Sequence, residues 1–272
     1  MNTLLLWIFC PLMAYAQTYH IAQEEISTMS FASANTGVCL WKLNQIPKNP
    51  ALLARQSGMA FNILSRNYFF TPGILNVSVA YSNVLNQNSG YAIVLGTSGS
   101  KDYYQYALRA GYGRSLGRKT MVGASMHFTT NQTSEHHGSV DANFSLGICS
   151  QLLQTLMVGC FFQNPGQFFQ PKGHSIPVLI KTGFNYRIHE NLEVMTELHQ
   201  PYQEPSAIAF GILYCPVVNL QLAIGIKTVG PILSLGFKYA ISESWQWSSG
   251  FEHQPSLGIS LCGEFEYRVN KR

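Results

Sequence analysis

The sequence predicts an all-β fold, a transmembrane antiparallel β-barrel of about fourteen strands with an N-terminal plug segment. Three observations predict it: few charged residues, repeated runs of alternating apolar and polar side chains, and aromatic residues near the ends of those runs. Only 11% of the 272 residues are charged, against roughly 25% in a soluble domain. With 46% hydrophobic residues, the chain has a composition suited to a lipid-facing exterior.

The alternating runs define the strands. Leu233, Leu235 and Phe237 share one face of such a run, and Ser234, Gly236 and Lys238 share the other. A lysine or arginine facing lipid at mid-membrane costs about 2–4 kcal/mol, so the charged face must turn inward. We expect strands near residues 57–66, 74–82, 90–98, 103–114, 119–129, 138–149, 155–163, 177–188, 192–199, 207–215, 219–227, 231–241, 245–253 and 257–269.

Aromatic residues gather where these strands are expected to cross the membrane interfaces, because amphipathic rings prefer the headgroup level. They are Tyr103, Tyr104, Tyr106, Tyr112, Tyr239, Trp245, Trp247 and Tyr267. An even strand count places both ends of the barrel in the periplasm.

The first residues predict export. Leu4 to Ala14 form a short apolar core, and Ala14-Tyr15-Ala16 places small residues at the positions that a signal peptidase reads. We expect residues 1–16 to be a cleaved signal peptide and the mature chain to lie in the cell outer membrane, in contact with its lipid. A retained anchor helix is the alternative, but the apolar stretch is shorter than the roughly 20 residues that a spanning helix needs.

Residues 17–56 do not show the alternation of the strands, which occupy residues 57–272. A barrel of about fourteen strands is intermediate between small barrels filled by side chains and open porins. Its lumen has room for a folded segment, so residues 17–56 are predicted to sit inside it as a plug.

Inward-facing charges of both signs indicate salt bridges across the lumen or between wall and plug, rather than a pore selective for one sign. Two interpretations stay open: internal packing of a plugged barrel, which we favour, and a substrate pathway. The principal residues of this set are Arg109, Asp141, Lys181, Arg187, Glu197, Lys227, Lys238, Glu264 and Glu266, and Arg66, Glu193, Glu252 and Arg268 belong to it too.

No residue pattern indicates a catalytic, cofactor or metal site. His136-His137 after Glu135 is expected to be a solvated loop, because adjacent ligands need further partners. His127 with Ser125, and Asp141 with Ser145 on the next strand, could serve a hydrolase only with a serine–histidine contact and a third, orienting group; we do not expect an enzyme.

Two other features also argue for a protein without such a site. The net charge of +4 has no basic cluster, so no nucleic-acid binding is expected. The cysteines of the mature chain are scattered and odd in number, which fits small apolar fillers on strands better than a metal site or disulfide framework. They are Cys39, Cys149, Cys160, Cys215 and Cys262.

Asn49-Pro50-Ala51, just before the first expected strand, resembles the NPA signature of FadL-like outer-membrane barrels. Within that group the run from Ile176 to Arg187 and the run from His253 to Leu261 are similar to the PorV/PorQ proteins of the type IX secretion system. The resemblance implies fourteen strands, an N-terminal plug and a non-enzymatic role. The Gly-rich run that precedes the NPA in the family is reduced here, and the chain is shorter than most members.

Two functions follow from this resemblance. The first is an accessory component of protein secretion or surface attachment that binds cargo or partners, with secretion or surface-attachment proteins as partners. The alternative is a FadL-like outer-membrane transporter of hydrophobic small molecules, which requires an apolar pocket and a lateral opening in the wall.

Overall fold

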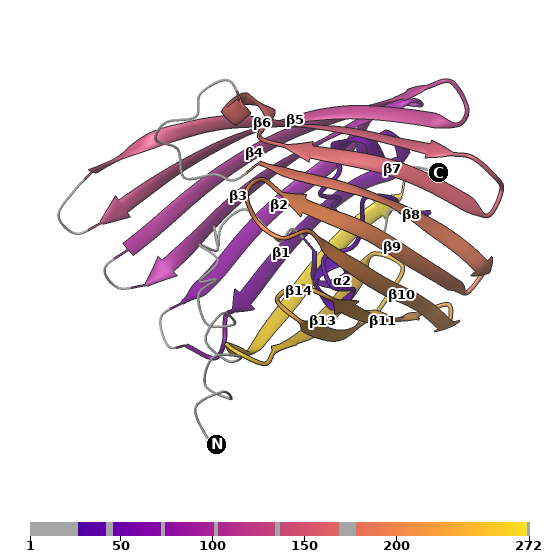
Figure 1. Ribbon diagram of the computed structural model, residues 1–272. Coiled ribbons are helices and arrows are strands. Elements are labelled where there is room, and N and C mark those ends of the chain that lie inside the picture. Colours follow the sequence, from indigo (N-terminus) through magenta and orange to yellow (C-terminus); the bar gives the residue numbers. More distant parts are fainter. Residues whose placement is uncertain are drawn as a thin grey trace, which may run out of the picture.

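A closed barrel forms most of the molecule (Figure 1). The computed structural model describes residues 27–41, 46–71, 74–100, 103–133, 137–168 and 178–270. In these residues fourteen antiparallel strands each pair with their neighbours in sequence, and β1 pairs with β14. The strands are β1 (Gly58–Asn67), β2 (Leu75–Asn86), β3 (Ser89–Ser100), β4 (Tyr103–Leu116), β5 (Thr120–Thr133), β6 (His137–Gln151), β7 (Leu156–Gln163), β8 (Leu179–His189), β9 (Leu192–Pro201), β10 (Ala207–Val217), β11 (Leu220–Lys227), β12 (Ile232–Ala240), β13 (Trp245–Gln254) and β14 (Gly258–Asn270).

The predicted fold class, a fourteen-stranded antiparallel barrel, is confirmed. Along each strand the exposed fraction alternates as the sequence predicts. On β8 Lys181 is 4% exposed and Phe184 is 41% exposed; on β12 Ser234 is 0% exposed and Leu235 is 43% exposed. A slip of one residue would exchange the two faces, so the inward charges and outward apolar residues fix the register.

Outward aromatic rings lie together near the rim where β1 begins and β14 ends, which we call the terminal rim. The ring of Trp245 lies 4.7 Å from that of Tyr267 and 5.2 Å from that of Phe265, measured between centroids. Trp247 on β13 pairs across the ladder with Tyr239 on β12. This arrangement agrees with the predicted girdle at the headgroup level.

The predicted strand boundaries differ most at the ends of β2 and β5, which lie at Asn86 and Thr133 rather than at residues 82 and 129. The β2–β3 hairpin extends further than expected, because the ladder continues through the polar stretch after residue 82 to the pair Asn86–Ser89. The bounds of β7 agree with the prediction to within one residue. Its ladder with β6 is short, because on that strand it reaches only Ser145 to Gln151.

The rest of β6 therefore has one edge without a strand. Among the described residues, no strand pairs with the β7-facing edge of β6 from His137 to Phe144, which we call the open edge of β6. Beside it the amide of Asn164 donates to the carbonyl oxygen of Phe144 at 2.9 Å, and the 3₁₀ helix η3 (Pro165–Phe168) follows.

Residues 27–41 and 46–56, which we call the inner segment, lie inside the barrel (Figure 1). The α-helix α2 (Thr28–Ala32) packs on β11 to β14, and the 3₁₀ helix η2 (Pro50–Arg55) packs on β3 to β6. The described helices include none that is long and apolar enough to cross a bilayer. The predicted signal peptide, 1–16, and residues 17–26 of the predicted plug lie outside the described residues, so the division at 16 and 56 stays a prediction.

Candidate functional site: the inner segment and the barrel wall

Both helices of the inner segment begin at side-chain caps. The hydroxyl of Ser27 accepts a hydrogen bond from the amide of Met29 at 3.2 Å and starts α2. The side-chain oxygen of Asn49 accepts from the amide of Ala51 at 3.0 Å, with Pro50 at the first helical position of η2. Such caps satisfy amides that the first helical turn leaves unpaired.

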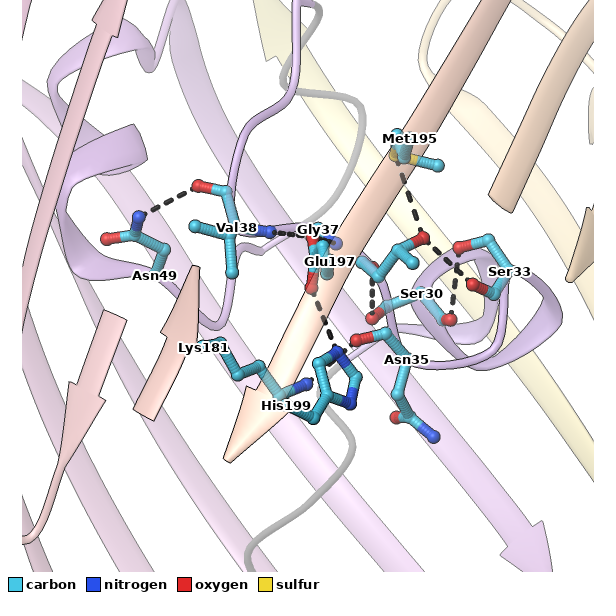
Figure 2. Close-up of polar contacts among 11 residues, drawn as sticks. Ser30, Ser33, Asn35, Gly37, Val38, Asn49, Lys181, Met195, Glu197 and His199 are labelled. Carbon is cyan, nitrogen blue, oxygen red and sulfur yellow. Dashed lines mark hydrogen bonds and ion pairs between the residues drawn. The ribbon is translucent and has the colours of Figure 1, made fainter. Parts of the chain in front are cut away.

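Asn49 also ties this helix to the rest of the inner segment. Its side-chain nitrogen donates to the carbonyl oxygen of Val38 at 2.8 Å (Figure 2) and lies 3.5 Å from the carbonyl oxygen of Ile148 on β6. The side chain is 1% exposed. The Asn49-Pro50-Ala51 motif is therefore a buried junction between helix, inner segment and wall.

Inward glycines allow the inner segment to lie directly against the strands. Gly113, Gly123 and Gly147 are neighbours across β4, β5 and β6. A methyl group at Gly123 would clash with the backbone of Pro50, and one at Gly147 would clash with the side chain of Asn49. The missing side chains leave the space that η2 occupies.

A second group of glycines receives α2 on the other side of the barrel. Gly236 on β12 and Gly250 on β13 are a cross-strand pair. A Cβ atom at Gly236 would lie 2.5 Å from that of Ala32, and one at Gly250 would lie 2.8 Å from the ring of Phe31.

Buried charges of the wall bind the backbone of the inner segment. One carboxylate oxygen of Glu197 on β9 accepts hydrogen bonds from the amides of Gly37 at 2.6 Å and Val38 at 2.7 Å, and the other oxygen lies 3.1 Å from Nε2 of His199 (Figure 2). Lys181 on β8 donates to the carbonyl oxygen of Asn35 at 2.8 Å. These bonds compensate the loss of hydration of the charges.

Two further wall charges repeat the pattern elsewhere in the barrel. Glu264 on β14 accepts from the amide of Thr28 at 2.8 Å and from the side chain of Asn62 at 2.7 Å. Arg109 on β4 donates to the carbonyl oxygens of Pro47 at 2.8 Å and Lys48 at 2.9 Å. The wall thus holds main-chain atoms of the inner segment from β4, β8, β9 and β14.

The remaining inward charges pair mainly within the wall. Lys238 lies 2.7 Å from Glu266, which also contacts Arg268. Two further pairs have nitrogen-to-oxygen distances of 3.7 Å and 3.4 Å. In that order, those pairs are Arg187 with Glu193 and Arg66 with Glu252. Asp141 on β6 and Lys227 on β11 are half-buried on the inward face. All nine principal charges named from the sequence thus lie on inward positions, but only four of them bind the inner segment's backbone in the contacts described above.

The sequence did not predict the contacts between arginine side chains of the wall and aromatic rings. The guanidinium group of Arg66 lies 4.2 Å from the ring centre of Phe31 and 4.1 Å from that of Tyr68. That of Arg187 lies 4.3 Å from the ring centre of Trp41. Cation–π contacts of this kind stabilise desolvated guanidinium groups.

A small cavity lies beside the described part of the inner segment. The cavity bordered by Ser30, Gly37, Lys48, Phe161 and Lys181 has a volume of about 10 Å³, which is about the room for one water molecule.

A larger hollow lies on the outward face of β2 to β6. This outer groove has a volume of about 470 Å³ and a mostly apolar lining. Val77, Thr97, Tyr106, Thr130 and Val140 form one continuous cross-strand row of it. The other lining residues are Val79, Leu95, Gly96, Ala107, Leu108, Phe128 and Thr129. Val140 belongs to the open edge of β6, so the groove ends where the wall ladder is incomplete.

The structure brings together the serine–histidine group that the sequence suggested. Nε2 of His127 lies 3.0 Å from the hydroxyl of Ser125 and 3.1 Å from that of Ser145. In the described part of the chain no carboxylate contacts His127 to orient its ring, and all three side chains are buried. His136 of the other histidine candidate lies outside the described residues, and the described residues contain no cluster suited to a metal ion.

No protein-family model and no curated protein matches the sequence. Solved structures do match. The toluene transporter TodX of Pseudomonas putida has a TM-score of 0.69 and 12% identity over 91% of this chain and 98% of its own. The toluene transporter TbuX of Ralstonia pickettii has a TM-score of 0.67 and 11% identity, with 91% and 99% covered. A FadL homologue of Pseudomonas aeruginosa has a TM-score of 0.64 and 8% identity, with 90% and 98% covered.

The accessory role in protein secretion or surface attachment expected from the sequence is wrong, because the structures that share the fold are hydrocarbon channels, toluene transporters and a FadL homologue. The PorV/PorQ resemblance rested on two short runs, Ile176 to Arg187 and His253 to Leu261. The neighbours are transporters and channels rather than enzymes, and they agree with the expected place in the outer membrane. In fold, the chain is a closed antiparallel barrel of fourteen strands that is similar to these outer-membrane barrels.

Proposed function

We propose that the protein carries hydrophobic small molecules across the outer membrane, and that residues 17–56 form the plug of a barrel spanning residues 57–272. The observation that carries the proposal is the shared fold over about nine-tenths of the chain with proteins described as toluene transporters. This is the transporter alternative that the FadL resemblance implied.

The outer groove supports this proposal by its size and chemistry. Pockets for small molecules have volumes of roughly 300–1,000 Å³ and mostly apolar walls, and the groove has about 470 Å³. Because it opens on the outward face, a solute dissolved in the lipid could enter it without crossing water. An aromatic hydrocarbon fits this volume and lining.

The open edge of β6 supports a route from the groove toward the lumen. Val140 of the groove and the inward residue Asn143 lie on this stretch of β6. The side-chain amide of Asn143 is buried, and neither of its polar atoms has a hydrogen-bond partner among the described residues. An unsatisfied amide costs about 1–3 kcal/mol, so this inward position is poorly suited to permanent closure.

Passage along this part of the lumen also requires movement of the inner segment, because the cavity between the segment and Lys181 admits about one water molecule. Its anchors are individual hydrogen bonds from wall side chains to main-chain atoms. Such bonds can be exchanged for bonds to water one at a time, so partial release of the segment does not require unfolding of the barrel.

The experiment is uptake of radiolabelled toluene by cells that produce the protein and otherwise lack an outer-membrane hydrocarbon channel. We expect faster uptake than in cells with an empty vector. Thr97→Phe and Thr130→Phe, which fill the outer groove, should slow it. Thr182→Phe is the matched control, because Thr182 is exposed on the outward face of β8, away from the groove.

Equal uptake with and without the protein, at matched amounts of folded barrel in the outer membrane, would overturn the proposal. Equal loss in all three phenylalanine variants would show that the groove has no special role.

A further inference from the structure

Two buried cysteines meet at the boundary between the inner segment and the wall. Cys39 belongs to the inner segment and Cys149 to β6, and their sulfur atoms lie 3.0 Å apart. Both are free thiols in this structure, with exposed fractions of 2% and 0%. The two residues are 110 positions apart in the sequence, so the fold alone brings them together.

The wall makes room for the sulfur of Cys39. Gly159 on β7 is the cross-strand partner of Cys149. A Cβ atom at Gly159 would lie 2.6 Å from the sulfur of Cys39, closer than real Cβ contacts allow. The absence of a side chain at Gly159 therefore lets Cys39 approach the strand at the place where Cys149 points inward.

The main chain around Cys39 is held on both sides. The carbonyl oxygen of Cys39 accepts a hydrogen bond from the side chain of Asn185 at 3.2 Å. The preceding residue, Val38, donates to Glu197 at 2.7 Å and accepts from Asn49 at 2.8 Å. The contact between the sulfurs is thus part of a fixed arrangement of the backbone, in which each sulfur has the other as a near neighbour.

From this geometry we propose that Cys39 and Cys149 are a cross-linking site, at which a disulfide bond fixes the inner segment to β6 in the exported protein. A disulfide has a sulfur–sulfur distance of about 2.05 Å, so the sulfurs need to approach by about 1 Å from 3.0 Å. Exported proteins fold in oxidising compartments, where such bonds form and persist.

The reaction is thiol–disulfide exchange with an oxidant of the disulfide class, such as a periplasmic protein disulfide. One thiolate attacks the oxidant and gives a mixed disulfide. The second thiolate attacks that bond, which forms the link between Cys39 and Cys149 and releases the oxidant as a dithiol. Two electrons pass to the oxidant, and the two protons lost by the cysteines balance those that the dithiol gains.

The bond should form while the inner segment enters the barrel rather than afterwards. The hydrogen bond to Cys149 and burial raise the pKa of the Cys39 thiol, and only the thiolate reacts. In the closed barrel the thiolate is scarce and the oxidant has no access. The cross-link would therefore form only as the inner segment packs against β6.

The cross-link does not depend on the proposed transport, and it has a mechanical consequence for any movement of the inner segment. With the bond formed, Cys39 cannot leave β6, so movement is confined to the parts on either side of it. The capping residue Ser27 precedes Cys39 in the chain, and the Asn49-Pro50-Ala51 motif follows it, so both can still move.

The test is peptide mapping of the full protein taken from outer membranes, with free thiols blocked by N-ethylmaleimide in denaturant before any reduction. Trypsin releases Cys39 in a peptide that ends at Lys42 and Cys149 in the peptide of residues 120–172. A Cys160→Ser background leaves Cys149 as the one cysteine in the second peptide. We expect the two peptides to be joined and to separate after reduction with dithiothreitol.

Cys39→Ser and Cys149→Ser should each abolish the joined species, and Cys215→Ser should leave it unchanged. Recovery of Cys39 and Cys149 both blocked by N-ethylmaleimide, in protein that was never reduced, would overturn the proposal. That result needs only the chain with both cysteines, so misfolding of a variant cannot obscure it.

Discussion

The carboxylate of Glu197 accepts a hydrogen bond from the main-chain amide of Gly37 at 2.6 Å, although 160 positions separate the two residues. Glu197 lies on β9 and Gly37 in the inner segment, so the bond joins the wall to the segment that fills it. A buried carboxylate without such partners would be costly. The bond therefore stabilises both the charge and the position of the inner segment.

Replacing this carboxylate should loosen the inner segment without opening the barrel. A hydrogen bond to a charged group contributes about 1.5–3 kcal/mol, so Glu197→Gln should weaken the hold on Gly37 and Val38 by about 2 kcal/mol. Amide hydrogen exchange at these two residues should become roughly thirtyfold faster. Glu266→Gln is the control, since its partners Lys238 and Arg268 both belong to the wall; equal acceleration in both variants would contradict the assignment.

Adding a methyl group at Gly123 should displace η2. The group would clash with the backbone of Pro50 and Ala51, and overpacking of this kind costs about 1–3 kcal/mol. We expect Gly123→Ala to raise ion conductance in planar bilayers, because a displaced segment admits water. Gly263→Ala on β14 is the control, since a Cβ atom there has no neighbour within 4 Å. Unchanged conductance in a folded Gly123→Ala barrel would count against the predicted plug.

The two roles of Asn49 can be separated by the choice of substitution. Asn49→Ser keeps a side chain that can cap η2 but loses the bond to Val38, whereas Asn49→Ala loses both. We expect the alanine variant to be less stable than the serine variant by about 1 kcal/mol, measured as the midpoint of urea unfolding in lipid. Equal midpoints for the two variants would show that the cap contributes nothing.

The outward face should reject charge according to depth. Leu235 is 43% exposed in the middle of β12, and a lysine at mid-membrane costs about 2–4 kcal/mol. Leu235→Lys should lower the free energy of unfolding in lipid vesicles by that amount. Leu257→Lys, in the turn between β13 and β14, should change it by about 1 kcal/mol or less. Similar losses at the two positions would mean that the belt of outward apolar residues does not face hydrocarbon.

The barrel could be predicted from the sequence because its signal repeats. Along the strands, charged, polar or small side chains alternate with large apolar ones. Lys181 and Phe184 lie on opposite faces of β8 in this way, and a one-residue error reverses the whole pattern. The boundaries were harder, since polar residues such as Asn86 can continue a ladder as well as end it.

The arrangement of the inner segment could not be read in the same way. The helix α2 has 5 residues and η2 has 6, too few for a helical period to show. The bonds that place them join charged side chains to main-chain atoms, as from Lys181 to Asn35, so no complementary side chain marks the partner. The glycines were the available sequence signal for the place where η2 packs. Gly113, Gly123 and Gly147 become cross-strand neighbours when β4, β5 and β6 are aligned as hairpins.

The grip on the main chain has an evolutionary consequence. Main-chain amide and carbonyl groups do not depend on the side chain. The wall therefore recognises the backbone conformation of the inner segment and not its side chains, through Arg109, Lys181, Glu197 and Glu264. In related proteins, many residues of the inner segment can then be substituted while its backbone conformation is preserved. Selection should act instead on the strands that surround the inner segment. Sequence similarity between relatives should therefore be higher in these strands than in the inner segment.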